Sequence, residues 1–149
     1  FDCSLKALEI ARMNAQGLAE QIGGRSEFIF GDIRKTIKLP HDSCDVILCN
    51  PPYIGSDDKL PDSVRNYEPH VALFPGDKKG LSLYRYVANR CEELVSDHGG
   101  LVVVEIGYGQ ADDVVGIFAD YAPRLQFEVA TKDISGIPRA LACRNCVEM

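Results

Sequence analysis

The tetrapeptide Asn50-Pro51-Pro52-Tyr53 contains the residue types that suggest chemistry most directly. Each proline fixes φ near about −65°, donates no backbone hydrogen bond and disfavours helix at the preceding residue, so this corner of the chain is stiff before any ligand arrives. The side-chain carbonyl of Asn50 and the neighbouring backbone carbonyls are acceptors that can converge on one small region. Such a corner suits a substrate that carries an NH2 group.

An amide or an aromatic amine is a poor nucleophile because its lone pair is delocalised into the adjoining π system. Acceptors that grip both N–H bonds would orient the nitrogen and favour its pyramidalisation, so positioning rather than a base would carry the catalysis. Tyr53 adds a flat amphipathic face on which a planar substrate can stack. The alternative is an ordinary tight turn followed by a core tyrosine.

The composition is that of a single soluble globular domain. A length of 149 residues fits the usual range of about 100–200 residues per domain. No apolar run approaches the roughly 18 residues of a membrane span, so no membrane partner is expected. The net charge of −6 disfavours a general phosphate-binding surface and direct nucleic-acid binding, and it favours protein or small-molecule partners.

The six cysteines occur without a signal peptide, and we interpret them as reduced thiols of an intracellular, cytoplasmic protein. Cys143 and Cys146 form a single CxxC in a predicted strand, where the odd spacing directs the two thiols to opposite faces. Zinc motifs normally bring a second pair of ligands, and the three histidines are dispersed. No metal site is therefore expected.

Hydrophobic spacing predicts helices that alternate with apolar strands. This alternation predicts an α/β fold with a mostly parallel sheet and helices on both faces. The stretch 51–80, rich in Pro, Asp and Gly, is predicted to be a long loop, and loops of this length are usually functional or disordered. Three helices are predicted: one from the N-cap Ser4 to Gly23-Gly24, one over 81–95 and one that includes 114–121. The predicted strands are 26–30, 44–49, 101–106, 127–131 and 140–149.

Four polar residues fall at or just past the ends of these strands: Asp2, Asp32, Asn50 and Glu105. In parallel sheets, ligands bind at the carboxyl ends of the strands. These four side chains are therefore candidates for one ligand-binding edge.

With these residues in this order, the chain resembles a Rossmann-like S-adenosylmethionine-dependent methyltransferase, a class in which NPPY is the amino-methyltransferase signature. Two further segments, VRNYEPHVALFPGDKKGLSLYR (64–85) and EIGYGQ (105–110), are similar to the HemK-like protein-glutamine N(5)-methyltransferases of peptide chain release factors. NPPY alone is shared with adenine and guanine methyltransferases. The combination of NPPYI, YEPxxAL and EIGxxQ is much more specific, and the similarity covers nearly the whole chain.

The resemblance implies S-adenosylmethionine as the cofactor. Asp2 would bind its ribose hydroxyls, Asp32 would lie at the adenine amine and Ile33 against the adenine ring, while Asn50 would border the cofactor from the substrate side. Taken singly, Asp2 and Asp32 would be interpreted as capping or turn residues.

The resemblance also implies a substrate site at the proline corner. Asn50 and the Pro51 carbonyl would hold the substrate glutamine amide, Pro52 would complete the catalytic corner, and Tyr53 would pack against the amide.

Two acidic residues are candidates for the walls of that site. Glu68 would form one wall of the substrate pocket, with a solvated turn residue as the alternative. Glu105 would orient the floor, with a structural hydrogen bond as the alternative. Four basic residues are candidates for contact with a partner protein or its RNA surroundings, but they are interpreted as solvated: Arg65, Lys132, Arg139 and Arg144.

The chain departs from the family pattern at its N-terminal side. The first strand, its glycine-rich loop and an N-terminal helical domain have no counterpart, and Asp2 is already the second residue. We therefore expect residues 1–149 to be the C-terminal part of a methyltransferase catalytic domain. In the family topology the first strand lies beside the strand 44–49, so this strand is expected to have an unpaired edge through which the fragment self-associates.

Three functions remain open from the sequence. The resemblance implies metal-free, in-line methyl transfer to the glutamine of a release factor's Gly-Gly-Gln motif by the parent protein, with the fragment itself inactive. The second is methylation of an exocyclic amine of a nucleic-acid base, which requires an exposed base and a phosphate grip. The third is a non-catalytic binding or assembly module.

Overall fold

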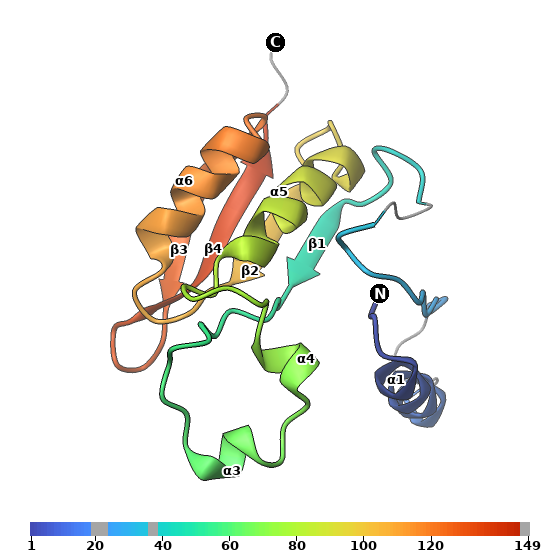
Figure 1. The fold of residues 1–149 in the computed structure, drawn as a ribbon. Coiled ribbons are helices and arrows are strands. Elements are labelled where there is room, and N and C mark those ends of the chain that lie inside the picture. Colours follow the sequence, from blue (N-terminus) through green and yellow to red (C-terminus); the bar gives the residue numbers. More distant parts are fainter. Residues whose placement is uncertain (19–23, 36–38, 147–149) are drawn as a thin grey trace. The chain divides into compact units, whose positions relative to one another are not determined.

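The computed structural model describes residues 1–18, 24–35 and 39–146. The chain divides into two compact units, Phe1–Lys38 and Leu39–Met149, and each is described by itself (Figure 1). None of the described helices is both long and apolar enough to cross a membrane.

The first unit contains helix α1, which spans Leu5–Gly17. Ser4 is its N-cap, as the sequence predicts, and its hydroxyl accepts a hydrogen bond from the Ala7 N–H at 3.2 Å. This bond satisfies one of the backbone donors that a helix leaves free in its first turn. The predicted continuation of the helix to Gly23-Gly24 falls largely outside the described residues.

The predicted strand 26–30 does not form. Only Phe30 pairs with Asp2, in an isolated parallel bridge. The bridge is held by two bonds, from the Asp2 N–H to the Ile29 carbonyl at 3.1 Å and from the Gly31 N–H to the Asp2 carbonyl at 3.0 Å. Among the described residues, no further pair continues the ladder on either side of this bridge.

The second unit is built on a four-stranded sheet of order β1-β2-β4-β3. Strands β1 and β2 are parallel, whereas β4 is antiparallel to both β2 and β3. The expectation of a mostly parallel sheet is therefore wrong for the described strands, because the short connection between β3 and β4 makes a hairpin and a hairpin is antiparallel. The strands are β1 (Val46–Cys49), β2 (Leu101–Glu105), β3 (Leu125–Lys132) and β4 (Pro138–Asn145).

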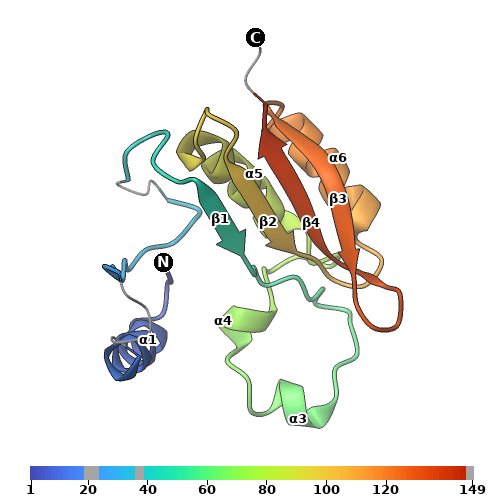
Figure 2. The ribbon, with the colours of Figure 1, turned by 180° about the vertical axis from the view of Figure 1, so that it is seen from behind.

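Two long helices, α5 (Ser82–Leu94) and α6 (Ala111–Tyr121), pack on the same face of this sheet (Figures 1 and 2). Both were predicted from their helical spacing, and the mixed α/β class is confirmed. The core lies between these helices and the sheet, and its fully buried side chains include Tyr84, Val87, Val102, Val104 and Val114.

Strand β1 lies at the edge of the described sheet, as the sequence predicts. The apolar run of this strand suggests burial, but its alternate residues Val46 and Leu48 are 55% and 76% exposed. The reason is positional: the edge has one neighbouring strand, and these two side chains point away from the face that α5 and α6 cover. Ile47 and Cys49, on the helix side, are half-buried.

The stretch 51–80, predicted as a loop, contains two short helices, α3 (Asp62–Arg65) and α4 (His70–Leu73). In each case the N-cap position is a proline, Pro61 or Pro69. The first N–H groups of a helix have no intrahelical acceptor, so a proline at the N-terminus removes no hydrogen bond from the helix. These two prolines are therefore compatible with the short helices that follow them.

Candidate functional site

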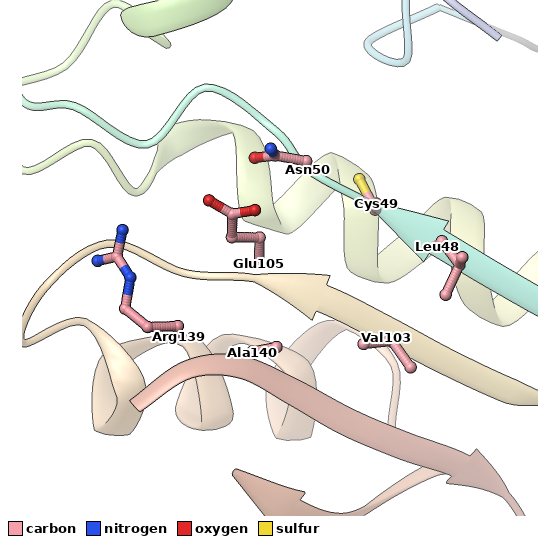
Figure 3. A pocket seen from close by; sticks show the side chains of 7 residues that line it. All are labelled: Leu48, Cys49, Asn50, Val103, Glu105, Arg139 and Ala140. Carbon is pink, nitrogen blue, oxygen red and sulfur yellow. The ribbon is translucent and has the colours of Figure 1, made fainter. Parts of the chain in front are cut away.

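A pocket of about 560 Å³ lies over the carboxyl ends of β1 and β2 and the start of β4 (Figure 3). Its polar side chains are Asn50, Glu105 and Arg139, which come from three different segments. The Asn50 side chain is exposed and has no hydrogen-bond partner among the described residues. Apolar side chains of the sheet complete the lining: Leu48, Cys49, Val103 and Ala140.

Tyr53 is fixed beside this pocket by two of its lining residues. Its hydroxyl donates to Glu105 Oε1 at 2.9 Å. The guanidinium of Arg139 donates to the same hydroxyl at 3.4 Å, and its carbon lies 5.8 Å from the centre of the tyrosine ring. Burial, together with the hydrogen bond to the Glu105 carboxylate and its negative charge, raises the pKa of Tyr53. The phenol therefore stays neutral at pH 7 and acts as a donor.

The segment after the two prolines is tied to residues far along the chain. The Ile54 N–H donates to the Leu73 carbonyl and the Ser56 N–H to the Asp77 carbonyl, both at 3.0 Å. Gly80 has φ +70°, and a Cβ on it would lie 2.0 Å from the Tyr53 carbonyl oxygen. Only glycine permits this approach, so the NPPY corner is held by its neighbours as well as by its own prolines.

Cys49 lines the same pocket, but it is not a candidate nucleophile. Burial raises the pKa of its thiol to about 11. Because the thiolate is the reactive form, this cysteine is inert near neutral pH.

Not every predicted substrate residue reaches the pocket. Asn50 and Glu105 line it, and Tyr53 contacts Glu105 and Arg139 at its border. Glu68 is exposed between α3 and α4 and is not among the lining residues. Pro51 is buried and is not among them either.

Arg139 is the pocket residue that sequence reasoning missed, since it was interpreted as solvated. A signal for it exists in the strand register. Ala140 pairs with Glu105 in the antiparallel β2–β4 ladder, which brings Arg139 to the end of β2. The antiparallel pairing of the closing strand had to be known before this proximity could be recognised.

The first unit brings Asp2 and Asp32 near each other through the bridge between Asp2 and Phe30. Asp2 Oδ1 accepts from the Ser4 N–H at 2.7 Å. The Asp32 carboxylate accepts from Arg34 Nε at 2.9 Å and from its Nη2 at 2.7 Å. These side-chain hydrogen bonds lower the pKa of Asp32 to about 2, so it is ionised at all ordinary pH values.

Among the residues that the structure describes, no group of three or more His, Cys, Asp or Glu side chains could hold a metal ion. In the CxxC, Cys143 is buried in β4 and Cys146 is exposed just past its end, so the two cysteines do not share a strand as predicted.

The relatives of this chain are methyltransferases by name. It is 37% identical over 146 residues to a release factor glutamine methyltransferase of Koribacter versatilis, which covers 97% of this chain and 48% of that protein. It is also 37% identical over 147 residues to the protein of the same name from Bradyrhizobium diazoefficiens, which covers 97% of this chain and 46% of that protein. No family model matches the chain.

A solved structure, a release factor-specific protein-(glutamine-N5) methyltransferase from Alicyclobacillus acidocaldarius, aligns with a TM-score of 0.41 and 18% identity over 73% of this chain and 83% of that one. This structural likeness is too weak to support a conclusion about the chain. The sequence relatives confirm the resemblance to release factor glutamine methyltransferases along nearly the whole chain. The chain spans about half the length of the relatives it matches.

Proposed function

We propose that residues 1–149 form the C-terminal part of a methyltransferase catalytic domain that methylates the side-chain amide nitrogen of the glutamine in the Gly-Gly-Gln motif of peptide chain release factors. The observation that carries the proposal is the Asn50 carboxamide, which lines an open pocket with no partner among the described residues. The names of the relatives supply the substrate class. Such an enzyme would act in the cytoplasm.

In this proposal the chain's own residues position the substrate nitrogen. Asn50 Oδ1 and the Pro51 carbonyl accept the two N–H bonds of the substrate amide, which fixes the direction of the nitrogen lone pair. The ring of Tyr53, held through its hydroxyl by Glu105, provides a flat surface for the planar amide. The Glu105 carboxylate also favours the positive charge that develops on the nitrogen as it is alkylated.

The residues proposed for the cofactor fit S-adenosylmethionine, which when bound supplies an electrophilic methyl group. Asp2 uses Oδ1 for the Ser4 N–H, and its second oxygen can accept from a ribose hydroxyl. Asp32 is ionised and suits an amine, which would share its carboxylate with Arg34. Ile33 is half-buried and offers an apolar surface to an adenine ring.

The test is methyl incorporation by the complete gene product that contains this chain. Purified release factor, duplex DNA and ribosomal RNA are each offered with labelled S-adenosylmethionine. We expect label on the release factor alone, and none on a release factor whose motif glutamine is replaced by alanine. Labelled nucleic acid with unlabelled release factor would establish a base methyltransferase instead, and no label on any substrate would favour a binding module.

A further inference from the structure

The side chain of Gln110 joins three separate segments of the second unit. Its Nε2 donates to the Tyr53 carbonyl at 2.9 Å and to the Lys79 carbonyl at 2.9 Å. Its Oε1 accepts from the Gly107 N–H at 2.9 Å and lies 3.2 Å from the Tyr84 hydroxyl. The carboxamide therefore uses both of its donors, and its oxygen accepts from the Gly107 N–H and shares the single Tyr84 hydroxyl hydrogen with the Glu105 carbonyl.

Tyr84 fixes which way this carboxamide points. Its side chain is fully buried, and its hydroxyl lies 3.2 Å from both the Glu105 carbonyl and Gln110 Oε1. Burial raises the pKa of Tyr84, so the hydroxyl remains a donor. The Tyr84 hydroxyl and the Gly107 N–H both lie at Gln110 Oε1, so the NH2 group of Gln110 must face the Tyr53 carbonyl.

The segment EIGYGQ has the spacing that this grip requires. A Cβ on Gly107 would lie 2.6 Å from Gln110 Oε1, and Gly109 has φ +74°, a conformation that favours glycine. The two glycines let the chain turn so that the side chains of Glu105 and Gln110 both reach Tyr53. Glu105 holds its hydroxyl at 2.9 Å, and Gln110 holds its carbonyl.

We propose that Gln110 is the positioning residue of the NPPY corner and selects which carbonyls face the substrate. By binding the Tyr53 carbonyl it removes that oxygen from the acceptors near the pocket, so that Asn50 and the Pro51 carbonyl remain for the NH2 group. It also clamps the corner against the segment that contains Lys79. The substrate in this inference rests on the proposed function. The hydrogen bond from Gln110 to the Tyr53 carbonyl does not depend on that function.

The experiment compares Gln110→Glu with wild type and with Gln126→Glu, a matched control in an exposed position on β3. Gln110→Glu keeps an acceptor for Gly107 and replaces the NH2 group by an oxygen that faces two carbonyls. We expect kcat for release factor to fall about 100-fold, the effect of roughly 1 Å of misplacement, with the Kd for S-adenosylmethionine within about twofold of wild type.

A pH profile separates this role from a general loss of folding. A carboxyl group enclosed by carbonyl oxygens has a raised pKa, and its protonated form regains one donor. The kcat of Gln110→Glu should therefore recover in part as the pH falls, while wild type and Gln126→Glu show no such recovery. Amide hydrogen exchange of residues 53–56, which follow the two prolines, measured on the same samples, should be faster in Gln110→Glu alone.

Each outcome decides whether Gln110 positions the NPPY corner or only contributes to folding. A Gln110→Glu enzyme with wild-type kcat, or with a loss that matches its unfolded fraction at every pH, would overturn the positioning role. If wild type labels no release factor, the proposed function fails. Hydrogen exchange then decides the Gln110 proposal by itself, and unchanged exchange in residues 53–56 would reject it.

Discussion

At the scale of single residues, Asn50 gives the sharpest prediction. Its side chain is exposed and has no partner among the described residues, so Asn50→Ala should change the free energy of unfolding by no more than about 0.5 kcal/mol. Without its acceptor the substrate nitrogen is no longer oriented, and we expect turnover by the complete gene product to fall at least about 100-fold. The measurements are steady-state kinetics and calorimetric binding of S-adenosylmethionine.

The contrary result is equally specific for Asn50. If cofactor binding and turnover are lost together, Asn50 supports the local structure and does not hold the substrate amide. Asn50→Asp serves as the companion variant, because it keeps an oxygen acceptor and the approximate shape of the side chain. It should retain more activity than Asn50→Ala.

The residues that sequence reasoning could find are those at strand ends in a recognised order. Asn50 and Glu105 were found in this way, and both line the pocket. Arg139 and Gln110 were not, because their proximity to Tyr53 is created by an antiparallel register and by a turn. Gln110 belongs to the EIGxxQ segment, but the sequence does not indicate what either side chain contacts, since the partners lie 86 and 57 positions apart.

At the scale of elements, helix α5 depends on an aspartate outside it. Asp77 Oδ1 accepts from the Ser82 N–H and Oδ2 from the Leu81 N–H, both at 3.0 Å. This carboxylate therefore caps the first turn, although the N-cap residue Leu81 has no capping side chain. We expect Asp77→Ala to lower the free energy of unfolding by about 1 kcal/mol, measured by urea titration, while Asp120→Ala, an exposed substitution in α6, does not.

The contribution of Asp77 should also depend on pH. Burial alone would raise the pKa of Asp77, but hydrogen bonds from Ser82, Leu81 and Lys79 outweigh it and lower the pKa below its usual value. The stabilisation is thus fully present above the unfolded-state pKa of about 4 and is lost as the pH falls through the lower folded-state value. The stability difference between wild type and Asp77→Ala should shrink below pH ~4. A difference that grows on acidification would contradict this cap.

Elements with a long, regular hydrophobic period were predicted well. The repeat of Tyr84, Ala88 and Cys91 gives α5, and all three side chains are buried. Short apolar runs were less informative, because their pairing is decided elsewhere. The run 26–30 lacks a partner of sufficient length, and the direction of β4 follows from its hairpin with β3. The hydrophobic pattern alone predicts neither the missing partner of 26–30 nor the direction of β4.

At the scale of the whole molecule, the second unit leaves one side of its sheet without a described helix of its own. Both long helices of this unit lie on the opposite face (Figure 2). The apolar side chains of β1 on the open side, Val46 and Leu48, are more than half exposed, and the outer edge of β1 has no neighbour among the described strands. An exposed apolar edge of this kind is a template for pairing with another chain.

We therefore expect the 149-residue chain to self-associate through β1 at micromolar concentration. Leu48→Lys should shift the population toward monomer in sedimentation velocity, because a charged side chain at an edge strand opposes pairing between two copies. Ile134→Lys, the same chemical change at a fully exposed position between β3 and β4, is the matched control and should leave the association unchanged. A wild-type chain that sediments as a clean monomer would refute the association, and equal effects of the two lysines would show that charge rather than the edge controls it.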